Sequence, residues 1–393
     1  MHAVRTLVRS IPLVSFVAIA ACGGARNAGD DVTGDDDNPP EDRLGCDGAT
    51  LLGTSADPAA QGPWDVGART VQIGRLTTEI WYPAAPGAAA GATPARYDIR
   101  QALSPSLRDD IPDDDNPWQA CDCYRDLPLD DGHGPYPVIV FVHGTAAFRH
   151  QSVTQMTHWA SRGFVVVAAD HPGLMLGDFL AMLCPDDPSG AQDLSGDLDA
   201  LLAALAAPAG DVGFLAGRVD ASRVAVVGHS AGGGAAAAAA GKPGVRVVIP
   251  LAANAATQQA GDLEQVLYMG GMADGIARWD NVQNVYQQSA TPRRLVGIAN
   301  AGHLVFSDLC ETRNAQGQNL LEVADEHQLC GAQFASFLFD CEPTYLDAAT
   351  GWDIVDAATS TVLETTLQCR DDLPDLAGIA ATYPDVGAYD QAL

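Results

Sequence analysis

Short, unbroken apolar runs recur along the chain, and most are followed by a segment with helical periodicity. Such runs are typical of strands that are covered on both faces, as in a parallel sheet. Strands that alternate with helices predict right-handed crossovers and helices on both faces of the sheet. We interpret 69–73, 77–82, 137–142, 164–169, 224–227, 245–250, 265–270 and 294–298 as strands, and 153–162, 193–207 and 231–240 as helices. The sequence therefore predicts an α/β fold with a mostly parallel central sheet.

One junction between a predicted strand and a predicted helix carries the sequence Gly228-His-Ser230-Ala-Gly232. The pattern G-x-S-x-G is weak alone, but between a strand and a helix it predicts a nucleophile elbow. The sharp turn lifts the Ser230 hydroxyl clear of the sheet, and the two glycines let strand and helix approach. The helix N-terminus then brings positive charge to a developing oxyanion. We therefore interpret Ser230 as a nucleophile.

A nucleophilic serine needs a base, which in this arrangement follows the serine along the chain. Among nine histidines, only His303 and His327 follow the elbow. His303 comes just after the strand predicted at 294–298, at the strand end where catalytic groups gather in α/β sheets. His327 lies in a polar, helix-like stretch and is interpreted as a surface residue. His303 is the predicted base.

The acid that orients the base should lie between the serine and the histidine. Asp274 follows the strand predicted at 265–270, at the same edge of the sheet, where it could accept the second imidazole N–H. Asp262 precedes that strand and so lies at the wrong edge, and Asp280 is the alternative. The predicted triad is therefore completed by Asp274.

An oxyanion formed by acyl transfer needs two backbone donors. The N–H of Ala231, directly after the nucleophile, is one candidate. The N–H of Thr145, in the loop after the strand predicted at 137–142, is the other. His143 is interpreted as a structural hydrogen-bonding residue, whereas His229 could either line the pocket or pack. No step of this chemistry needs a metal or another cofactor.

Four stretches of the chain carry a resemblance to a known group: 67–83, 138–144, 160–172 and 228–233. They resemble α/β-hydrolases of the platelet-activating-factor acetylhydrolase and dienelactone-hydrolase-like type, which also includes bacterial polyester hydrolases. The resemblance covers about residues 62–308. It implies an α/β-hydrolase fold and hydrolysis of carboxylic esters through an acyl-enzyme. Dienelactone hydrolases use a cysteine where this chain has Ser230, so their own reaction is not implied.

Several functions share this machinery and stay open. A lipase, a polyesterase or a phospholipase-like acylhydrolase would act on lipid or polymer esters, whereas a simple esterase would act on small-molecule esters. A serine peptidase or amidase uses the same three residues. A non-enzymatic surface protein is disfavoured because all three residues are present. The apolar segment 174–183 is compatible with a flap over the site or with a buried scaffold helix.

The first 22 residues have the features of an export signal, with Arg5 and Arg9 before a short apolar run. The run is too short to span a bilayer as a stable helix. It ends in Ile19-Ala-Ala-Cys22, which is similar to the lipobox of bacterial lipoproteins. We therefore expect 1–22 to be a lipoprotein signal peptide and Cys22 to be acylated. An ordinary signal peptide is the alternative. The glycine after Cys22 implies, by the same resemblance, the outer membrane of the cell envelope.

Composition divides the rest of the chain. Residues 23–45 are polar and acidic and are predicted to be a flexible linker. We expect a catalytic domain at 46–341 and a C-terminal extension with a final helix at 342–393. The formal net charge of −29 disfavours nucleic acid as a partner. Contact with a membrane is expected only through Cys22, and the oligomeric state stays open.

The chain has nine cysteines, of which eight remain after Cys22. An even number in an exported protein predicts up to four disulfides, but the pairing cannot be deduced from the sequence. No paired Cys-x-x-Cys motifs or Cys/His clusters indicate a zinc site. The eight are Cys46, Cys121, Cys123, Cys184, Cys310, Cys330, Cys341 and Cys369.

Overall fold

The structure is a computed structural model that describes residues 41–184, 187–335 and 339–393. The signal peptide predicted at 1–22, with Cys22, lies outside the described residues, as does the part of the predicted linker at 23–40.

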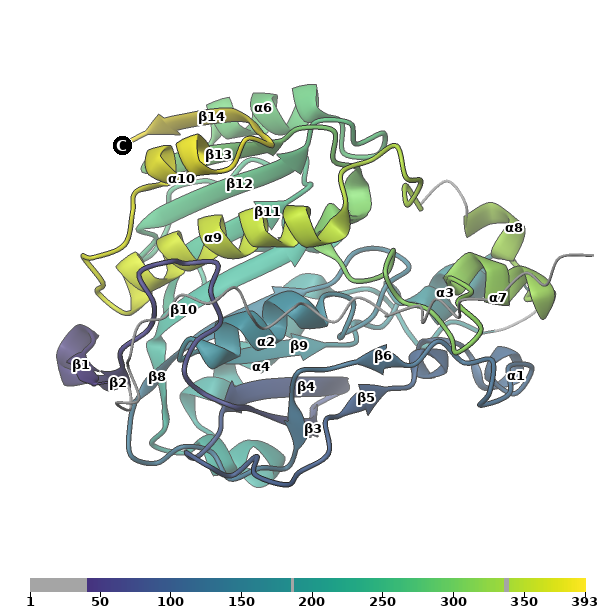
Figure 1. The fold of residues 1–393 in the computed structure, drawn as a ribbon, viewed down its shortest axis with the longest axis horizontal. Coiled ribbons are helices and arrows are strands. Elements are labelled where there is room, and N and C mark those ends of the chain that lie inside the picture. Colours follow the sequence, from purple (N-terminus) through teal and green to yellow (C-terminus); the bar gives the residue numbers. More distant parts are fainter. Residues whose placement is uncertain (1–40, 185–186, 336–338) are drawn as a thin grey trace, which may run out of the picture. The chain divides into compact units, whose positions relative to one another are not determined.

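A sheet of ten strands runs through the described part of the chain (Figure 1). The strands are β3 (Val66–Ile73), β4 (Leu76–Pro83), β7 (Tyr124–Arg125), β8 (Tyr136–Val142), β9 (Val165–Ala169), β10 (Val219–His229), β11 (Val245–Leu251), β12 (Gln265–Gly271), β13 (Arg293–Ile298) and β14 (Val386–Ala392). Their order is β14-β13-β12-β11-β10-β8-β9-β4-β3-β7. The six strands from β13 to β9 pair in parallel, and β4 and β14 pair antiparallel with their neighbours. The predicted α/β-hydrolase fold with a mostly parallel sheet is confirmed.

Helices cover both faces of the sheet, because each strand of the parallel part presents apolar side chains on both sides. On one face lie α2 (Val153–Ser161), α9 (Ala348–Leu367) and α10 (Leu376–Thr382), and on the other α4 (Leu194–Ala206), α5 (Ala231–Ala238) and α6 (Trp279–Gln288). Figure 1 shows α9 lying across the strands. Trp159 of α2 and Ile354 of α9 are fully buried in the first core, and Leu201 of α4 in the second. These two cores hold the sheet rigid beneath its loops.

The C-terminal segment is part of this fold. Val355 and Leu363 of α9 are fully buried in the same core as α2, and β14 pairs antiparallel with β13. The helix expected in the C-terminal extension at 342–393 is α9, but the structure does not set this segment apart, since Pro40–Leu393 form one unit and the chain ends in the strand β14. Because β14 is a half-exposed edge strand, its apolar pattern is too weak to predict.

The described chain begins in a small hairpin, β1 (Asp42–Leu44) paired with β2 (Thr50–Leu52), around the short 3₁₀ helix η1 (Cys46–Gly48). Residues 42–44 of the predicted linker thus form a strand. Cys46 forms a disulfide with Cys369, just after α9, so the two ends of the described chain are covalently linked.

The structure pairs all eight cysteines: Cys46–Cys369, Cys121–Cys123, Cys184–Cys330 and Cys310–Cys341. The Cys184–Cys330 disulfide lies in a group of short helices, which we call the helical lobe (residues 99–117, 174–184 and 309–335), and Cys310–Cys341 joins the lobe to the segment that follows it. The lobe contains η2 (Ile99–Ala102), α1 (Pro105–Arg108), α3 (Leu176–Ala181), α7 (Leu320–Glu326) and α8 (Ala332–Ala335). Figure 1 shows α1, α3, α7 and α8 gathered at one end of the sheet. The remaining short elements are β5 (Arg96–Tyr97), β6 (Gln119–Ala120) and η3 (Gly210–Leu215).

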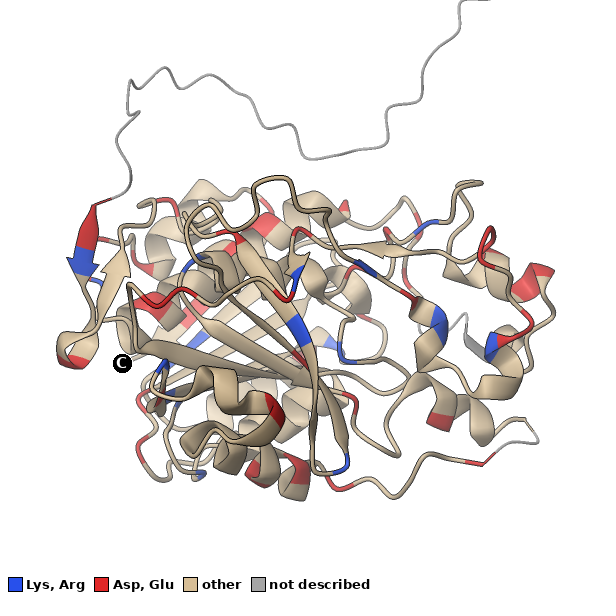
Figure 2. Ribbon diagram, turned by 90° about the horizontal axis from the view of Figure 1, so that it is seen from below, with Lys and Arg blue, Asp and Glu red and all other residues tan. Residues whose placement is uncertain are grey.

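Asp and Glu occur in helices and loops throughout the described chain, with few Lys and Arg between them (Figure 2). The negative charge is therefore a property of the whole described chain and not of one segment. Among the described helices, none combines the length and the apolar character needed to cross a bilayer.

Candidate active site

Ser230 occupies the turn between β10 and α5 in a backbone conformation that few residues adopt. Its φ is 57° and its ψ is −117°. A residue with a side chain costs on the order of 1–3 kcal/mol in such a region and persists only where its surroundings impose the conformation. Here the Ser230 N–H donates to Leu251 O over 2.9 Å, and the Ser230 carbonyl accepts from Gly234 N over 3.1 Å. This is the geometry of a nucleophile elbow, which the G-x-S-x-G pattern predicted.

The two glycines of the pattern are required by close backbone approach. A Cβ on Gly228 would lie 2.1 Å from the carbonyl oxygen of Gly232, and a Cβ on Gly232 would lie 2.1 Å from that of Val142. Both distances are shorter than any side chain tolerates. Glycine at these positions therefore lets α5 and β8 close on the turn that presents Ser230.

Asp274 and His303 come together although 29 residues separate them. Asp274 Oδ2 accepts a hydrogen bond from His303 Nδ1 over 2.8 Å, and both side chains are buried. Asp274 Oδ1 accepts from the N–H groups of Ile276 and Ala277 over 2.7 and 2.8 Å. Burial alone would raise the pKa of Asp274, but the hydrogen bonds from His303 and the two amides outweigh it and lower the pKa. The carboxylate therefore stays ionised and orients the imidazole.

The alternative acids and base lie elsewhere. Asp280 is exposed at the start of α6 and forms an ion pair with Arg278. Asp262 is exposed in the turn before β12. His327, at the end of α7, bonds through Nε2 to Asp115 over 3.1 Å. Of the three acids considered from the sequence, the structure brings only Asp274 to His303.

Ser230 and His303 line one cavity of about 160 Å³. His303 Nδ1 is hydrogen-bonded to Asp274, so Nε2 is the ring nitrogen that can bond to another group. In residues 41–184, 187–335 and 339–393, Nε2 has no hydrogen-bond partner. The cavity wall also includes the loop of Thr145, on the side of β8. The serine, the histidine and this loop thus share one concave site.

Backbone N–H groups in the loop after β8 differ in whether they have an acceptor in the described chain. The Gly144 N–H donates to Gln151 Oε1 over 2.8 Å, and the Ala146 N–H donates to Leu174 O over 2.9 Å. The N–H of Thr145, between them, donates to no described residue, and Thr145 lines the cavity. The Ala231 N–H is the first of α5 and so has no acceptor within the helix, and it has none elsewhere in the described chain. Both predicted oxyanion donors are therefore available.

A row of buried hydrogen bonds links the three loops of the site. Gln151 Oε1 accepts from Gly144, and Gln151 Nε2 donates to His229 Nδ1 over 3.2 Å. His229 Nε2 then donates to the carbonyl oxygen of His303 over 3.0 Å. Burial, reinforced by the nearby His303, lowers the pKa of His229 to about 3, so the ring stays neutral and serves as both donor and acceptor. His229 thus both lines the cavity and supports its walls, and Gln151 was not predicted.

Asp340 is a second carboxylate at the histidine loop that the sequence did not predict. Its Oδ2 accepts from the His303 N–H and its Oδ1 from the Leu304 N–H over 3.0 Å, at the start of the 3₁₀ helix η4 (His303–Phe306). Burial raises the pKa of Asp340. Cys341, the residue after Asp340, forms a disulfide with Cys310. This covalent bond anchors the segment from which Asp340 accepts the N–H groups of η4. Its contact with His303 spans 37 residues without a recognisable motif, which is why sequence analysis missed it.

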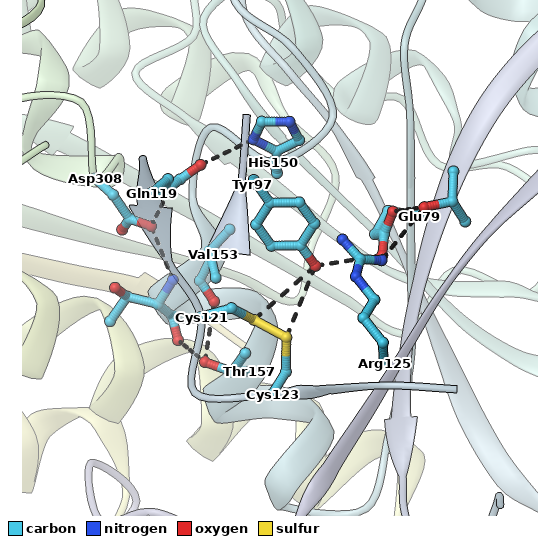
Figure 3. Close-up of a disulfide and its surroundings, with 12 residues drawn as sticks. Glu79, Tyr97, Gln119, Cys121, Cys123, Arg125, His150, Val153, Thr157 and Asp308 are labelled. Carbon is cyan, nitrogen blue, oxygen red and sulfur yellow. Dashed lines mark hydrogen bonds and ion pairs between the residues drawn. A yellow bond between two sulfur atoms is a disulfide. The ribbon is translucent and has the colours of Figure 1, made fainter. Parts of the chain in front are cut away.

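A cluster of buried polar side chains includes Asp308, which follows η4 in the chain (Figure 3). Asp308 Oδ2 accepts from the Thr154 N–H and from Gln119 Nε2, and Gln119 Oε1 bonds to His150 Nδ1 over 2.8 Å. Burial raises the pKa of Asp308 to about 6. The same view shows the Cys121–Cys123 disulfide beside this cluster. The cluster ties the chain after His303 to the N-terminus of α2.

Within the described residues, no group of three or more His, Cys, Asp or Glu side chains is arranged to hold a metal ion. The polar atoms of the site are those of a serine, an imidazole, a carboxylate and backbone amides. Such an arrangement can add a hydroxyl to a carbonyl group and stabilise the oxyanion that results.

Comparison with known proteins agrees with this arrangement. Residues 125–317 match the model of the PETase family, described as PET hydrolase-like. This stretch contains all five candidate residues of the site. A solved structure with a similar fold is ferulic acid esterase from Streptomyces cinnamoneus, at 19% identity and a TM-score of 0.54. The alignment covers 81% of this chain and 96% of the esterase. No curated protein sequence matches the chain.

The esterase likeness rests on the fold, whereas the family match rests on the sequence around the site itself. The likeness to the esterase shows the fold alone. By its match to the PETase family, this chain is a polyester-hydrolase-like α/β-hydrolase and thus a carboxylic ester hydrolase.

Proposed function

We propose that Ser230, His303 and Asp274 form the catalytic triad, which cleaves carboxylic esters through an acyl-enzyme intermediate. His303 Nε2 takes the hydroxyl proton as Ser230 Oγ attacks the ester carbonyl. The proton then passes to the leaving alcohol oxygen, and the acyl group stays on Ser230. Water, deprotonated by the same nitrogen, attacks the acyl-enzyme and releases the acid.

The observation that carries this proposal is the 2.8 Å hydrogen bond between Asp274 Oδ2 and His303 Nδ1, in a cavity that Ser230 also lines. That bond makes Nδ1 the protonated nitrogen, which leaves Nε2 as the acceptor that a general base requires. The backbone amides of Thr145 and Ala231 are the proposed oxyanion donors. Each such donor is worth about 100- to 1000-fold in kcat in enzymes of this type.

The direct experiment measures hydrolysis of p-nitrophenyl acetate and butyrate by the wild type and by Ser230→Ala. Ser230→Ala is expected to retain only background turnover. His303→Gln should behave in the same way, whereas His327→Gln, the matched control on α7, should keep wild-type rates. Wild-type rates in Ser230→Ala would refute the mechanism.

Amide hydrolysis is the competing use of the same residues. Comparison of p-nitroanilides with p-nitrophenyl esters of the same acyl group separates the two. We expect ester turnover to exceed anilide turnover, and the reverse would identify an amidase. Release of aromatic acids from polyester film would place the substrate among polymer esters, as the name of the matching family suggests.

We further propose that the protein is exported and anchored through an acylated Cys22, in the cell envelope. The lipobox-like sequence before Cys22 supports this. The four disulfides also support export, because disulfides persist in oxidising compartments. Cys22→Ala should move the protein from the membrane fraction to the soluble fraction of expressing cells. An unchanged distribution would contradict the anchor.

A further inference from the structure

A second cavity adjoins the catalytic one, inside the helical lobe. It measures about 100 Å³, and Ala146, Leu309 and Phe339 line both cavities. Ala146 directly follows Thr145, the proposed oxyanion residue, so the shared wall lies beside the position of a bound carbonyl group. The two cavities therefore adjoin at this wall, beside the place where a substrate at Ser230 would lie.

The walls of this second cavity are hydrocarbon. Among the described residues that line it, all but Arg100 and Asn116 have apolar side chains. Arg100 carries no free charge into the cavity, since its guanidinium bonds to Asp98 over 2.8 Å and to Asp113 over 2.6 Å. Asn116 Nδ2 also donates to Asp98, over 2.9 Å, whereas Asn116 Oδ1 is buried without a partner in the described chain and is the one unsatisfied polar atom among these two side chains. The site therefore favours an uncharged apolar group over a carboxylate or an amine.

The residues around the cavity do not belong to the two cores of the sheet. Leu103, Leu180, Val323 and Leu329 form an apolar cluster of their own within the lobe. The Cys184–Cys330 disulfide joins the end of α3 to the turn after α7 on either side of this cluster. The sheet and its helices would be complete without the lobe. The helical lobe therefore encloses an apolar cavity that an apolar ligand could fill.

We propose that this cavity binds the hydrocarbon acyl chain of the substrate, so that the enzyme prefers medium-chain acyl esters to acetates. The inference rests on the proposed function of Ser230. It commits to the acyl side because the acyl group stays bonded to Ser230 between the two steps, whereas the alcohol must leave. An engineered cavity of about 150 Å³ lined by similar residues in another protein takes up benzene, so an apolar space of this size can hold part of a short chain.

The test compares p-nitrophenyl esters from acetate to octanoate in the wild type. We expect kcat/KM to rise about fourfold for each methylene that enters the cavity, and then to level off. Ala324→Phe and Ala332→Phe each place a ring in the cavity wall and should abolish this rise in kcat/KM from acetate to octanoate. Ala203→Phe, on the exposed side of α4, is the matched control and should keep the full rise.

Two further measurements keep the proposal falsifiable. If the phenylalanine variants fail to fold, n-alkylboronic acids, which bind reversibly to nucleophilic serines, should inhibit the wild type more strongly as the chain lengthens. A flat profile with both reagents would overturn the acyl site. A chain-length effect among alkyl acetates, and none among p-nitrophenyl alkanoates, would assign the cavity to the alcohol and also overturn it. Absence of Ser230-dependent acetate hydrolysis would instead refute the proposed function itself.

Discussion

His229 Nε2 donates a hydrogen bond to the carbonyl oxygen of His303 over 3.0 Å, so the residue before the candidate nucleophile supports the loop of the candidate base. Gln151 completes the link, because it joins His229 to the backbone of Gly144. The elbow, the histidine loop and the oxyanion loop are therefore positioned relative to one another by two buried side chains.

Replacement of Gln151 by Leu should lower kcat by up to about 100-fold with a smaller change in KM, because misplacement of the loops by a fraction of an ångström weakens transition-state contacts. The unpaired Gly144 N–H should also lower the free energy of unfolding by about 1–3 kcal/mol. Steady-state kinetics and urea unfolding measure the two effects.

The matched control for that variant is Gln155→Leu. Gln155 is equally buried, on α2, but its amide atoms have no hydrogen-bond partner in the described chain. This change should leave kcat unchanged and should not destabilise the protein. Equal losses of kcat in the two variants would mean that Gln151 acts through packing alone.

Asp274→Asn should lower kcat by about 10⁴-fold, because an amide can no longer hold His303 in the tautomer that leaves Nε2 as the acceptor. Asp280→Asn, which removes an exposed carboxylate paired with Arg278, should leave kcat within about twofold of the wild type. Hydrolysis of p-nitrophenyl butyrate reports both. A large loss in Asp280→Asn with little change in Asp274→Asn would reassign the acid.

The protein should lose stability when the pH falls from 7 to 5. Burial lowers the pKa of His143 to about 4 and that of His229 to about 3, so between these values and 6.5 the unfolded chain binds more protons than the folded one. Asp308 acts in the opposite sense, since burial raises its pKa to about 6. The raised pKa values of Asp340 and His133 act in the same sense as Asp308, whereas His150, whose pKa burial lowers well below its usual value, adds to the loss. The buried histidines dominate, and the free energy of unfolding should fall by about 2 kcal/mol.

Urea unfolding at pH 7 and pH 5 measures that change. In Asp308→Asn the opposing proton uptake is absent, so the loss of stability between the two pH values should be larger than in the wild type. Equal stability at the two pH values would show that the buried histidines are not held neutral.

Two disulfides should contribute very differently to stability. Cys46–Cys369 closes a loop with a sequence separation of 323 residues, whereas Cys121–Cys123 has a separation of 2. Loop-closure entropy predicts that Cys46→Ser with Cys369→Ser costs about 6 kcal/mol, and that Cys121→Ser with Cys123→Ser costs about 1.5 kcal/mol. Thermal unfolding of the two double variants measures both losses of stability. A larger loss on removal of Cys121–Cys123 than on removal of Cys46–Cys369 would contradict the prediction.

The sequence was informative where chemistry and local geometry share a short motif. Gly228, Ser230 and Gly232 could be interpreted because the elbow needs two missing side chains and one strained serine at set positions. Asp274 and His303 could be placed because each follows a recognisable strand, and parallel strands end at one edge of the sheet. These inferences needed only the order of elements along the chain.

The parts that could not be predicted depend on contacts between distant segments. Asp340 reaches His303 through a loop that a disulfide holds, and nothing in its local sequence marks it. Gln151 resembles Gln155 in the sequence, and only the fold shows which of them bridges the site. Likewise, β14 becomes a strand because β13 offers an unpaired edge, not because its own residues alternate clearly.

The bond between Cys46 and Cys369 also determines how the protein bears mechanical load. Tension applied to the chain before Cys46 passes through sulfur to the end of α9, which is packed on the core. Strand β1 precedes Cys46 and carries this force first, whereas β2 and the strands after it are shielded by the disulfide. A pull on Asp42 would therefore move residues 46–369 as one body and would not open the sheet strand by strand.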